Sequence, residues 1–217
     1  MDGNTDGLSE KLVSYIGSLP AFEKLAHIDG NYGHMGATLA DAVLQSNNNY
    51  DRSVRPRIAE IRADYADHVS LEELRHLLRQ MTAQQFLRWN GTRKPKTFLE
   101  LVDLLVREGV NTEDELRQWL LLAGSRDKVC EIRFIGPKTA DYLKILVGLP
   151  ETAIDRHILG FLELAGIIKL NYNDSQDIVR QTADLMGLDR AHLDHSIWRY
   201  MTKATKTTRT ARVCRTH

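Results

Sequence analysis

Helix signals recur along nearly the whole chain, and they limit the possible folds more than any other feature of the sequence. Residues 97–108 place apolar side chains on one broad face, as an amphipathic helix does. Ser70 and Glu73 form a capping box that begins a helix ending near residue 81. Residues 111–114 cap a further helix, and no segment shows the alternating pattern of a half-buried strand. The sequence therefore predicts an all-α protein.

The composition is that of an ordinary globular protein. Of the 217 residues, 42% are hydrophobic and 27% are charged, and this length allows one large domain or two small ones. No run approaches the roughly 18 apolar residues that a membrane span needs. The first residues are polar and acidic, unlike a signal peptide. We therefore expect a cytoplasmic protein without a membrane partner.

Cysteine content and charge limit the cofactors and partners. Cys130 and Cys214 are the two cysteines, too few for a four-cysteine iron–sulfur cluster or a zinc site without other ligands, so we expect free thiols and no metal. The 29 basic and 29 acidic residues balance, but the chain after Tyr200 holds five basic residues and no acidic one. This basic tail (Lys203, Lys206, Arg209, Arg212 and Arg215) either contacts phosphates or stays in solvent.

Residues 130–166 contain the most informative pattern. The segment indicates a helix, a tight turn and a second helix, with Gly136 at the turn and Pro137 suited to the first helical position. Such a hairpin leaves backbone N–H groups of the second helix unpaired. These groups can bind a phosphate without reading a base sequence.

Two residues in this segment are candidates for a catalytic role. Lys138 lies in the first turn of the second helix, where the helix dipole lowers the pKa of a lysine and favours the neutral amine of a Schiff-base nucleophile. A surface lysine that contacts phosphate or solvent is the alternative interpretation. Asp155 immediately precedes an apolar helix and is expected to be its N-cap. A catalytic carboxylate at the same place is compatible with that capping role.

Residues 135–140 (IGPKTA), followed by residues 153–158 (AIDRHI), resemble the helix-hairpin-helix signature of DNA glycosylases. That superfamily includes endonuclease III and 8-oxoguanine DNA glycosylase, and the lysine-to-aspartate separation here (155 − 138 = 17) is close to theirs. The resemblance implies that Lys138 and Asp155 are catalytic. It also implies that the hairpin binds DNA through Ile135, Gly136, Pro137 and Thr139.

The resemblance extends more weakly over residues 37–200 and implies further roles. Gln45, at a predicted helix end, would fill the gap left by an extruded base. Arg156 would bind phosphate or lower the pKa of Asp155. Asp194, His195 and Trp89 are candidates for the base pocket, although helix capping and core packing explain these three residues as well.

Two departures from the family pattern affect these expectations. The hairpin usually carries two glycines two residues apart, and Phe134 occupies the first of these positions, so the backbone there must tolerate a side chain. The C-terminal cysteine cluster of endonuclease III-like members is absent, which favours the branches without an iron–sulfur cluster and an oxidised purine as substrate. The resemblance implies no required cofactor, and a monovalent cation at the hairpin carbonyls.

The sequence thus predicts two helical subdomains flanking a cleft, residues 1–35 with 150–217 and residues 36–149, with the helix-hairpin-helix at about 120–148. The expected function is excision of a damaged base from double-stranded DNA by a monomer, nucleoid-associated in a bacterium, followed by strand cleavage through a Lys138 Schiff base. A glycosylase without strand cleavage, a non-catalytic helix-hairpin-helix DNA-binding protein and a helical protein-interaction domain are the alternatives. Only the glycosylases account for both Lys138 and Asp155.

Overall fold

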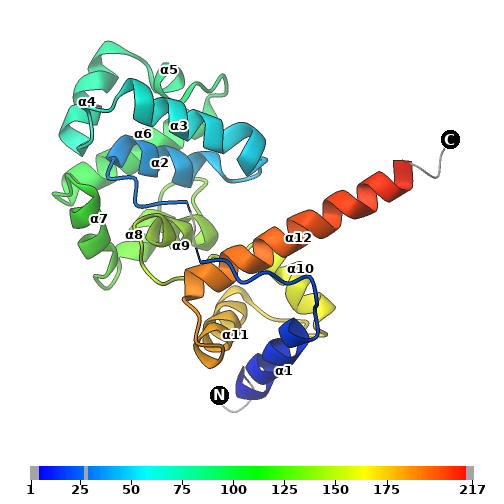
Figure 1. Ribbon diagram of the computed structural model, residues 1–217. Helices are drawn as coiled ribbons and strands as arrows, with labels where there is room; N and C mark the ends of the chain where they lie inside the picture. Colours follow the sequence, from blue (N-terminus) through cyan, green and yellow to red (C-terminus); the bar gives the residue numbers. More distant parts are fainter. Residues whose placement is uncertain (1–4, 27–28, 214–217) are drawn as a thin grey trace. The chain divides into compact units, whose positions relative to one another are not determined.

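The structure, a computed structural model, describes residues 5–26 and 29–213, with side chains given for 7–26 and 29–203. Over these residues it contains twelve α-helices, one short π-helix and no strand, which confirms the all-α prediction. The chain divides into two compact units (Figure 1). Unit 1 comprises Met1–Ile28 and Pro150–His217, and unit 2 comprises Asp29–Leu149.

Unit 2 is built around one buried helix, α2. All ten residues of α2 are buried, and the helix packs against α3, α4, α6 and α9. A helix that is apolar on nearly every side can be stable in water only when other elements cover it all round. Figure 1 shows α2 between α3 and α9. The elements of unit 2 are α2 (Met35–Leu44), η1 (Tyr50–Val54), α3 (Arg55–Asp64), α4 (Leu71–Gln80), α5 (Ala83–Leu87), α6 (Arg93–Arg107), α7 (Glu113–Leu120), α8 (Ser125–Cys130) and α9 (Pro137–Leu146).

Local capping signals set several helix ends in unit 2. Ser70 and Glu73 form the predicted capping box at the start of α4. The helix expected from residue 97 begins earlier, at Arg93, so Arg93 and Lys94 lie in the first turn of α6. Pro95 is compatible with this start because the first turn of a helix leaves its N–H groups unpaired.

Residues 29–35 correct one predicted boundary. The sequence-based division assigned them to the terminal subdomain, whereas they belong to unit 2. The Asn31 N–H donates to the Leu146 carbonyl (2.7 Å), and the Met35 N–H donates to the Val69 carbonyl (2.8 Å). These bonds hold the segment against unit 2 before α2 begins.

Unit 1 contains four helices, α1 (Thr5–Gly17), α10 (Arg156–Leu164), α11 (Tyr172–Leu185) and α12 (Arg190–Val213). Helix α11 packs on α1 and α12, and α10 packs on α12 (Figure 1). Phe161 is fully buried, and the rings of Tyr15, Phe22 and Tyr200 lie 5.3, 5.8 and 5.7 Å from its ring. This aromatic cluster fixes α1, α10 and α12 around one core.

The C-terminal basic run lies on α12 and beyond. Lys203 donates to Glu23 (2.8 Å), while the other side chains of the run and Cys214 fall outside the described part of the chain. None of the helices that the structure describes is long and apolar enough to cross a membrane.

Candidate functional site

The hairpin between α8 and α9 has the turn geometry of its motif. The Ile135 N–H donates to the Ile132 carbonyl (3.0 Å), which closes a tight turn with Arg133 and Phe134 at its centre. Phe134 has a φ of 72°, in the left-handed region. A type II turn requires such a φ at its third residue, where glycine is strongly preferred. The position therefore suits the glycine of the motif, yet here it carries a large side chain.

Gly136 presents the opposite situation. It is the N-cap of α9 with φ −110° and ψ 178°, an extended conformation open to any residue. A Cβ added there would meet no atom within 4 Å. Neither the backbone nor internal packing requires glycine, which is among the residues favoured at an N-cap, and its lack of a side chain leaves open space at the start of α9.

The other predicted hairpin residues differ in exposure. Pro137 is the first residue of α9 and is exposed, as Gly136 is. Ile135 and Thr139 are buried, so their side chains belong to the packing of unit 2. The exposed residues of the hairpin turn are Arg133, Phe134, Gly136 and Pro137.

Lys138, the second residue of α9, contacts the residue predicted to fill a base gap. Its Nζ donates a hydrogen bond to Oε1 of Gln45, 93 residues away in the sequence. The same Nζ lies 4.8 Å from the ring centroid of Tyr142. A carbonyl acceptor and an aromatic face both stabilise an ammonium group. The structure thus brings together two of the predicted functional residues.

Gln45 caps the end of α2, where its backbone N–H donates to the Asp41 carbonyl (3.1 Å). Its side-chain Nε2 is buried and has no hydrogen-bond partner within the described residues. An unsatisfied buried amide costs about 1–3 kcal/mol. The side chain is therefore held by Lys138 on one side and is poorly satisfied on the other.

A buried carboxylate accepts a hydrogen bond from the hydroxyl of Tyr142. Asp41, fully buried in α2, accepts hydrogen bonds from the hydroxyls of Tyr32 (2.7 Å), Tyr50 (2.9 Å) and Tyr142 (3.2 Å). Burial raises the pKa of Asp41 to about 6, against the opposing effect of the three hydroxyls. This cluster anchors the ring that contacts Lys138. Sequence analysis missed it, although one carboxylate inside an otherwise apolar helix was a usable signal.

Lys94 closes the C-terminal end of α2. Its Nζ donates to the carbonyls of Val43 (2.8 Å), Leu44 (3.0 Å) and Ser46 (2.9 Å). Desolvation, with Arg93 and Lys138 nearby, lowers the pKa of Lys94 to about 8. Carbonyls at the negative end of a helix oppose that shift. Lys94 thereby holds the turn that follows Gln45.

Trp89 supports Lys94. It packs against the core of unit 2, with the Lys94 ammonium 5.6 Å and the Arg57 guanidinium 5.3 Å from its ring. Its described contacts are those of a packing residue.

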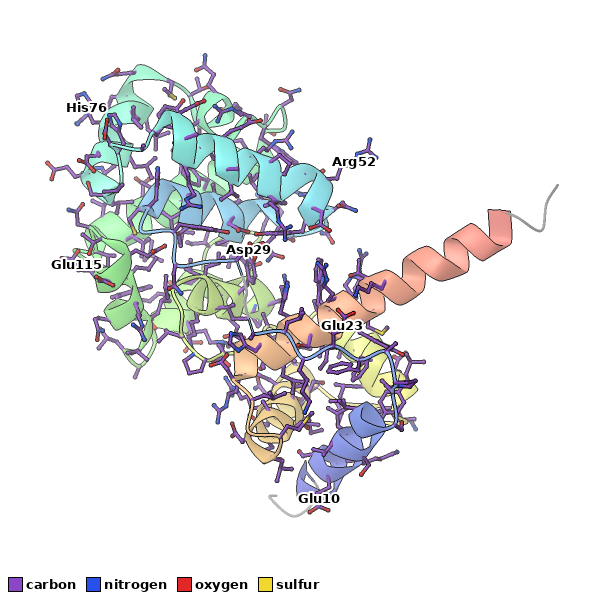
Figure 2. The ribbon with its side chains drawn as sticks, viewed as in Figure 1. Glu10, Glu23, Asp29, Arg52, His76 and Glu115 are labelled. Carbon is purple, nitrogen blue, oxygen red and sulfur yellow. The ribbon has the colours of Figure 1, made fainter. Side chains whose placement is uncertain are left out.

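A cavity of about 160 Å³ joins this turn to the hairpin. Its walls combine residues from the end of α2, the start of α6 and the hairpin: Val43, Ser46, Asn47, Arg93, Lys94, Thr97, Phe134, Ile135 and Thr139. Arg52, in the π-helix after the turn, is exposed and its side chain extends away from the ribbon (Figure 2).

Asp155 belongs to unit 1 and is the predicted N-cap of α10, which is confirmed. Its Oδ1 accepts hydrogen bonds from the backbone N–H groups of His157 (2.7 Å) and Ile158 (3.0 Å). Only one carboxylate oxygen serves the cap, so the other can act on a ligand. Arg156, the first residue of α10, is exposed.

Side chains from α11 and α12 fix the segment that leads to Asp155. The Ala153 N–H donates to Oδ2 of Asp194 (2.7 Å), and Gln176 Nε2 donates to the Thr152 carbonyl (2.7 Å). Asp194, a predicted pocket residue, thus has a role in positioning this segment.

The other predicted pocket residue of unit 1, His195, stacks on Trp198, with ring centroids 5.4 Å apart. The same Trp198 meets His157 edge-on at 6.5 Å. Trp198 is half-buried, and its chemistry would suit stacking on a base.

The residues that the structure describes include no group of three or more histidine, cysteine or acidic side chains able to hold a metal ion. Cys130 is a free thiol, and burial raises its pKa.

A family model described as "Domain of unknown function (DUF8548)" matches residues 10–202. The chain belongs to this family. No curated protein matches this DUF8548 member. A solved structure, that of the H. pylori 3-methyladenine DNA glycosylase MagIII bound to 1,N6-ethenoadenine, matches it with a TM-score of 0.62 and 16% sequence identity. The match covers 94% of this chain and 98% of the other, so the DUF8548 member has the fold of that enzyme, as the helix-hairpin-helix resemblance predicts.

Proposed function

We propose that this chain is a DNA glycosylase that removes a damaged base from duplex DNA. The contact between Lys138 and Gln45 carries the proposal. A residue able to enter a duplex and a cation at the start of the hairpin's second helix lie together in unit 2. They do so in a fold shared with a DNA glycosylase over nearly the whole chain.

The hairpin is proposed to bind the DNA backbone. Gly136 leaves open space at the start of α9, and Pro137 next to it is exposed. Phosphate oxygens approach closely at helix N-termini, where N–H groups and the helix dipole favour an anion. Such contacts place the protein on the duplex without selecting a sequence.

Gln45 is proposed to occupy the gap left by the extruded nucleotide. Extrusion costs a few kcal/mol of stacking and pairing, least at a damaged base. The Nε2 of Gln45 is buried without a partner in the free protein, so a hydrogen bond to the orphaned base would remove an existing penalty.

Asp155 is proposed to support cleavage of the N-glycosidic bond. The base leaves with the bonding electrons, positive charge develops on the sugar, and water then adds to C1′ and gives up a proton, which balances the proton that the free base takes up. A carboxylate stabilises that charge. The N–H groups of His157 and Ile158 hold the Asp155 carboxylate in one orientation through Oδ1.

The protonation state of Lys138 bears on whether the enzyme only hydrolyses the glycosidic bond or also cleaves the strand. Its contacts with Gln45 and Tyr142 stabilise the ammonium form, which favours a glycosylase that uses Lys138 as a cation and does not nick the strand. A Schiff-base lyase is the second candidate, because the first turn of α9 disfavours an ammonium.

The proposed substrate is a damaged purine. The missing cysteine cluster favours an oxidised purine, whereas the matched enzyme acts on 3-methyladenine and was solved with 1,N6-ethenoadenine. An oxidised and an alkylated purine are therefore both required in the test.

The test uses duplexes that carry 1,N6-ethenoadenine, 8-oxoguanine, uracil or an abasic site. Each is assayed for alkali-labile product, for direct nicking and for a borohydride-trapped adduct. We expect alkali-labile product at one damaged purine, without an adduct, and no product with Asp155→Asn. An adduct that disappears in Lys138→Gln but persists in the exposed control Lys24→Gln would establish the lyase instead. Absence of base release from every duplex by the folded protein would refute the glycosylase.

A further inference from the structure

Phe134 has two features that are unfavourable for the stability of the protein itself. Its backbone has a φ of 72°, which side-chain-bearing residues rarely adopt, and 54% of the residue is exposed to solvent. A glycine would relieve the strain and remove the exposed ring. Strained residues that contribute little to packing gather at binding and catalytic sites. The position therefore indicates a contact outside the protein.

The ring lies beside two cations. The guanidinium of Arg133, its neighbour in the turn, is 4.8 Å from the ring centroid, and that of Arg93, at the start of α6, is 5.3 Å away. Both arginines are exposed. Guanidinium groups bind phosphates, and aromatic rings stack on bases and sugars. This combination is complementary to a polyanion that also offers flat apolar faces.

The ring also faces the same hollow as the turn after Gln45. Phe134 is one wall of the cavity of about 160 Å³, and Ser46 and Asn47 are others. Arg93 lines it as well. Phe134 is therefore continuous with the surface that the proposed function assigns to the duplex.

We propose that Phe134 is a second side chain that contacts the duplex, stacking on a nucleotide beside the hairpin while Arg93 and Arg133 bind flanking phosphates. The proposal rests on the proposed function, because it takes duplex DNA as the partner. It gives the hairpin of this chain a stacking contact in addition to phosphate binding. We take DNA rather than a protein as the partner because the two charged groups given beside the ring, Arg93 and Arg133, are both positive.

The experiment measures the dissociation constant for a fluorescent duplex containing a tetrahydrofuran abasic analogue, over a series of salt concentrations. Phe134→Gly should weaken binding roughly 5- to 150-fold, the range of one lost stacking contact. The dependence on salt should be unchanged, since no charge is removed. Arg133→Gln should instead reduce the slope of log K against log salt by about 1.

Thermal unfolding of the same variants separates binding from folding. Phe134→Gly should raise Tm, because glycine accepts the positive φ without strain. Phe134→Asn also tolerates this conformation and should weaken binding similarly. The control Leu185→Asn removes another exposed apolar side chain, at the end of α11 in unit 1, and should leave binding unchanged.

Higher Tm together with weaker binding cannot come from a merely structural role and would support the proposal. Equal or tighter binding by Phe134→Gly, with the wild type binding normally, would overturn the role of Phe134 and leave the glycosylase proposal standing. Failure of the wild type to bind any duplex would refute both the role of Phe134 and the glycosylase proposal.

Discussion

The substitution Asp41→Asn tests whether the buried carboxylate that anchors Tyr142 makes stability depend on pH. Asp41 is fully buried, and its pKa is raised from 3.8 to about 6. The folded state therefore binds more protons than the unfolded state between about pH 4 and pH 6, and stability must fall as pH rises through that window. The difference of about 2 pKa units corresponds to about 3 kcal/mol at 1.36 kcal/mol per unit. Above about pH 7 this contribution is constant.

The assay is urea unfolding of the wild type and Asp41→Asn, monitored by circular dichroism from pH 4 to pH 8. The amide retains an acceptor for the tyrosine hydroxyls but does not titrate. The unfolding free energy of the wild type minus that of the variant should decrease by about 2.4 kcal/mol between pH 4 and pH 7, because part of the total is lost only below pH 4. Groups that titrate in both proteins cancel in this difference. The control Asp103→Asn removes an exposed carboxylate of α6 instead.

A difference that stays constant across the range would refute the reasoning. It would mean that the hydroxyls of Tyr32, Tyr50 and Tyr142 compensate fully for burial of the charge. Titration of the Asp41 carboxyl carbon by NMR, assigned through its loss in Asp41→Asn, gives an independent reading near pH 6.

Three further predictions concern single contacts. Lys94→Met removes a donor shared by three carbonyls at the end of α2, two of which keep the Asn48 amide as a second donor, so it should lower the unfolding free energy by about 2 kcal/mol and weaken duplex binding. Arg126→Met removes the guanidinium that pairs with the buried Asp141 carboxylate and should cost about 3–5 kcal/mol in urea unfolding, with partial rescue by adding Asp141→Asn. Asp155→Asn should keep its cap and its stability while losing base release, whereas Asp155→Ala should lose both, at about 1 kcal/mol of stability.

The parts of the structure that the sequence predicts are those encoded within one helical turn. The capping box of Ser70 and Glu73, the place of Pro137 at the first position of α9 and the N-cap Asp155 each depend on neighbours two or three residues away. The all-α class follows from such signals, and each could be identified without knowing the tertiary fold.

Contacts between distant segments could not be predicted in this way. Lys94 bonds to carbonyls about 50 residues earlier, and Tyr142 reaches Asp41 across 101 residues. The sequence shows the charge of Lys94 but not its acceptors, which are backbone atoms at the end of another helix. The residue type of Phe134 gives no sign of a left-handed backbone, and only its place in the motif, where glycine is usual, points to one.

The contacts around α2 connect Gln45, the residue proposed to fill the gap in the duplex, with the Lys138 cation. Asp41 anchors the Tyr142 ring on which the Lys138 ammonium rests, and Lys94 holds the turn from which Gln45 extends. If Gln45 enters a duplex, Lys138 loses its carbonyl acceptor while keeping the aromatic face. Under the proposed function, base extrusion would remove this one contact of Lys138 while the DNA backbone lies against the hairpin. Under the proposed function, the poorly satisfied amide of Gln45 would favour this movement, since a fully satisfied one would resist leaving.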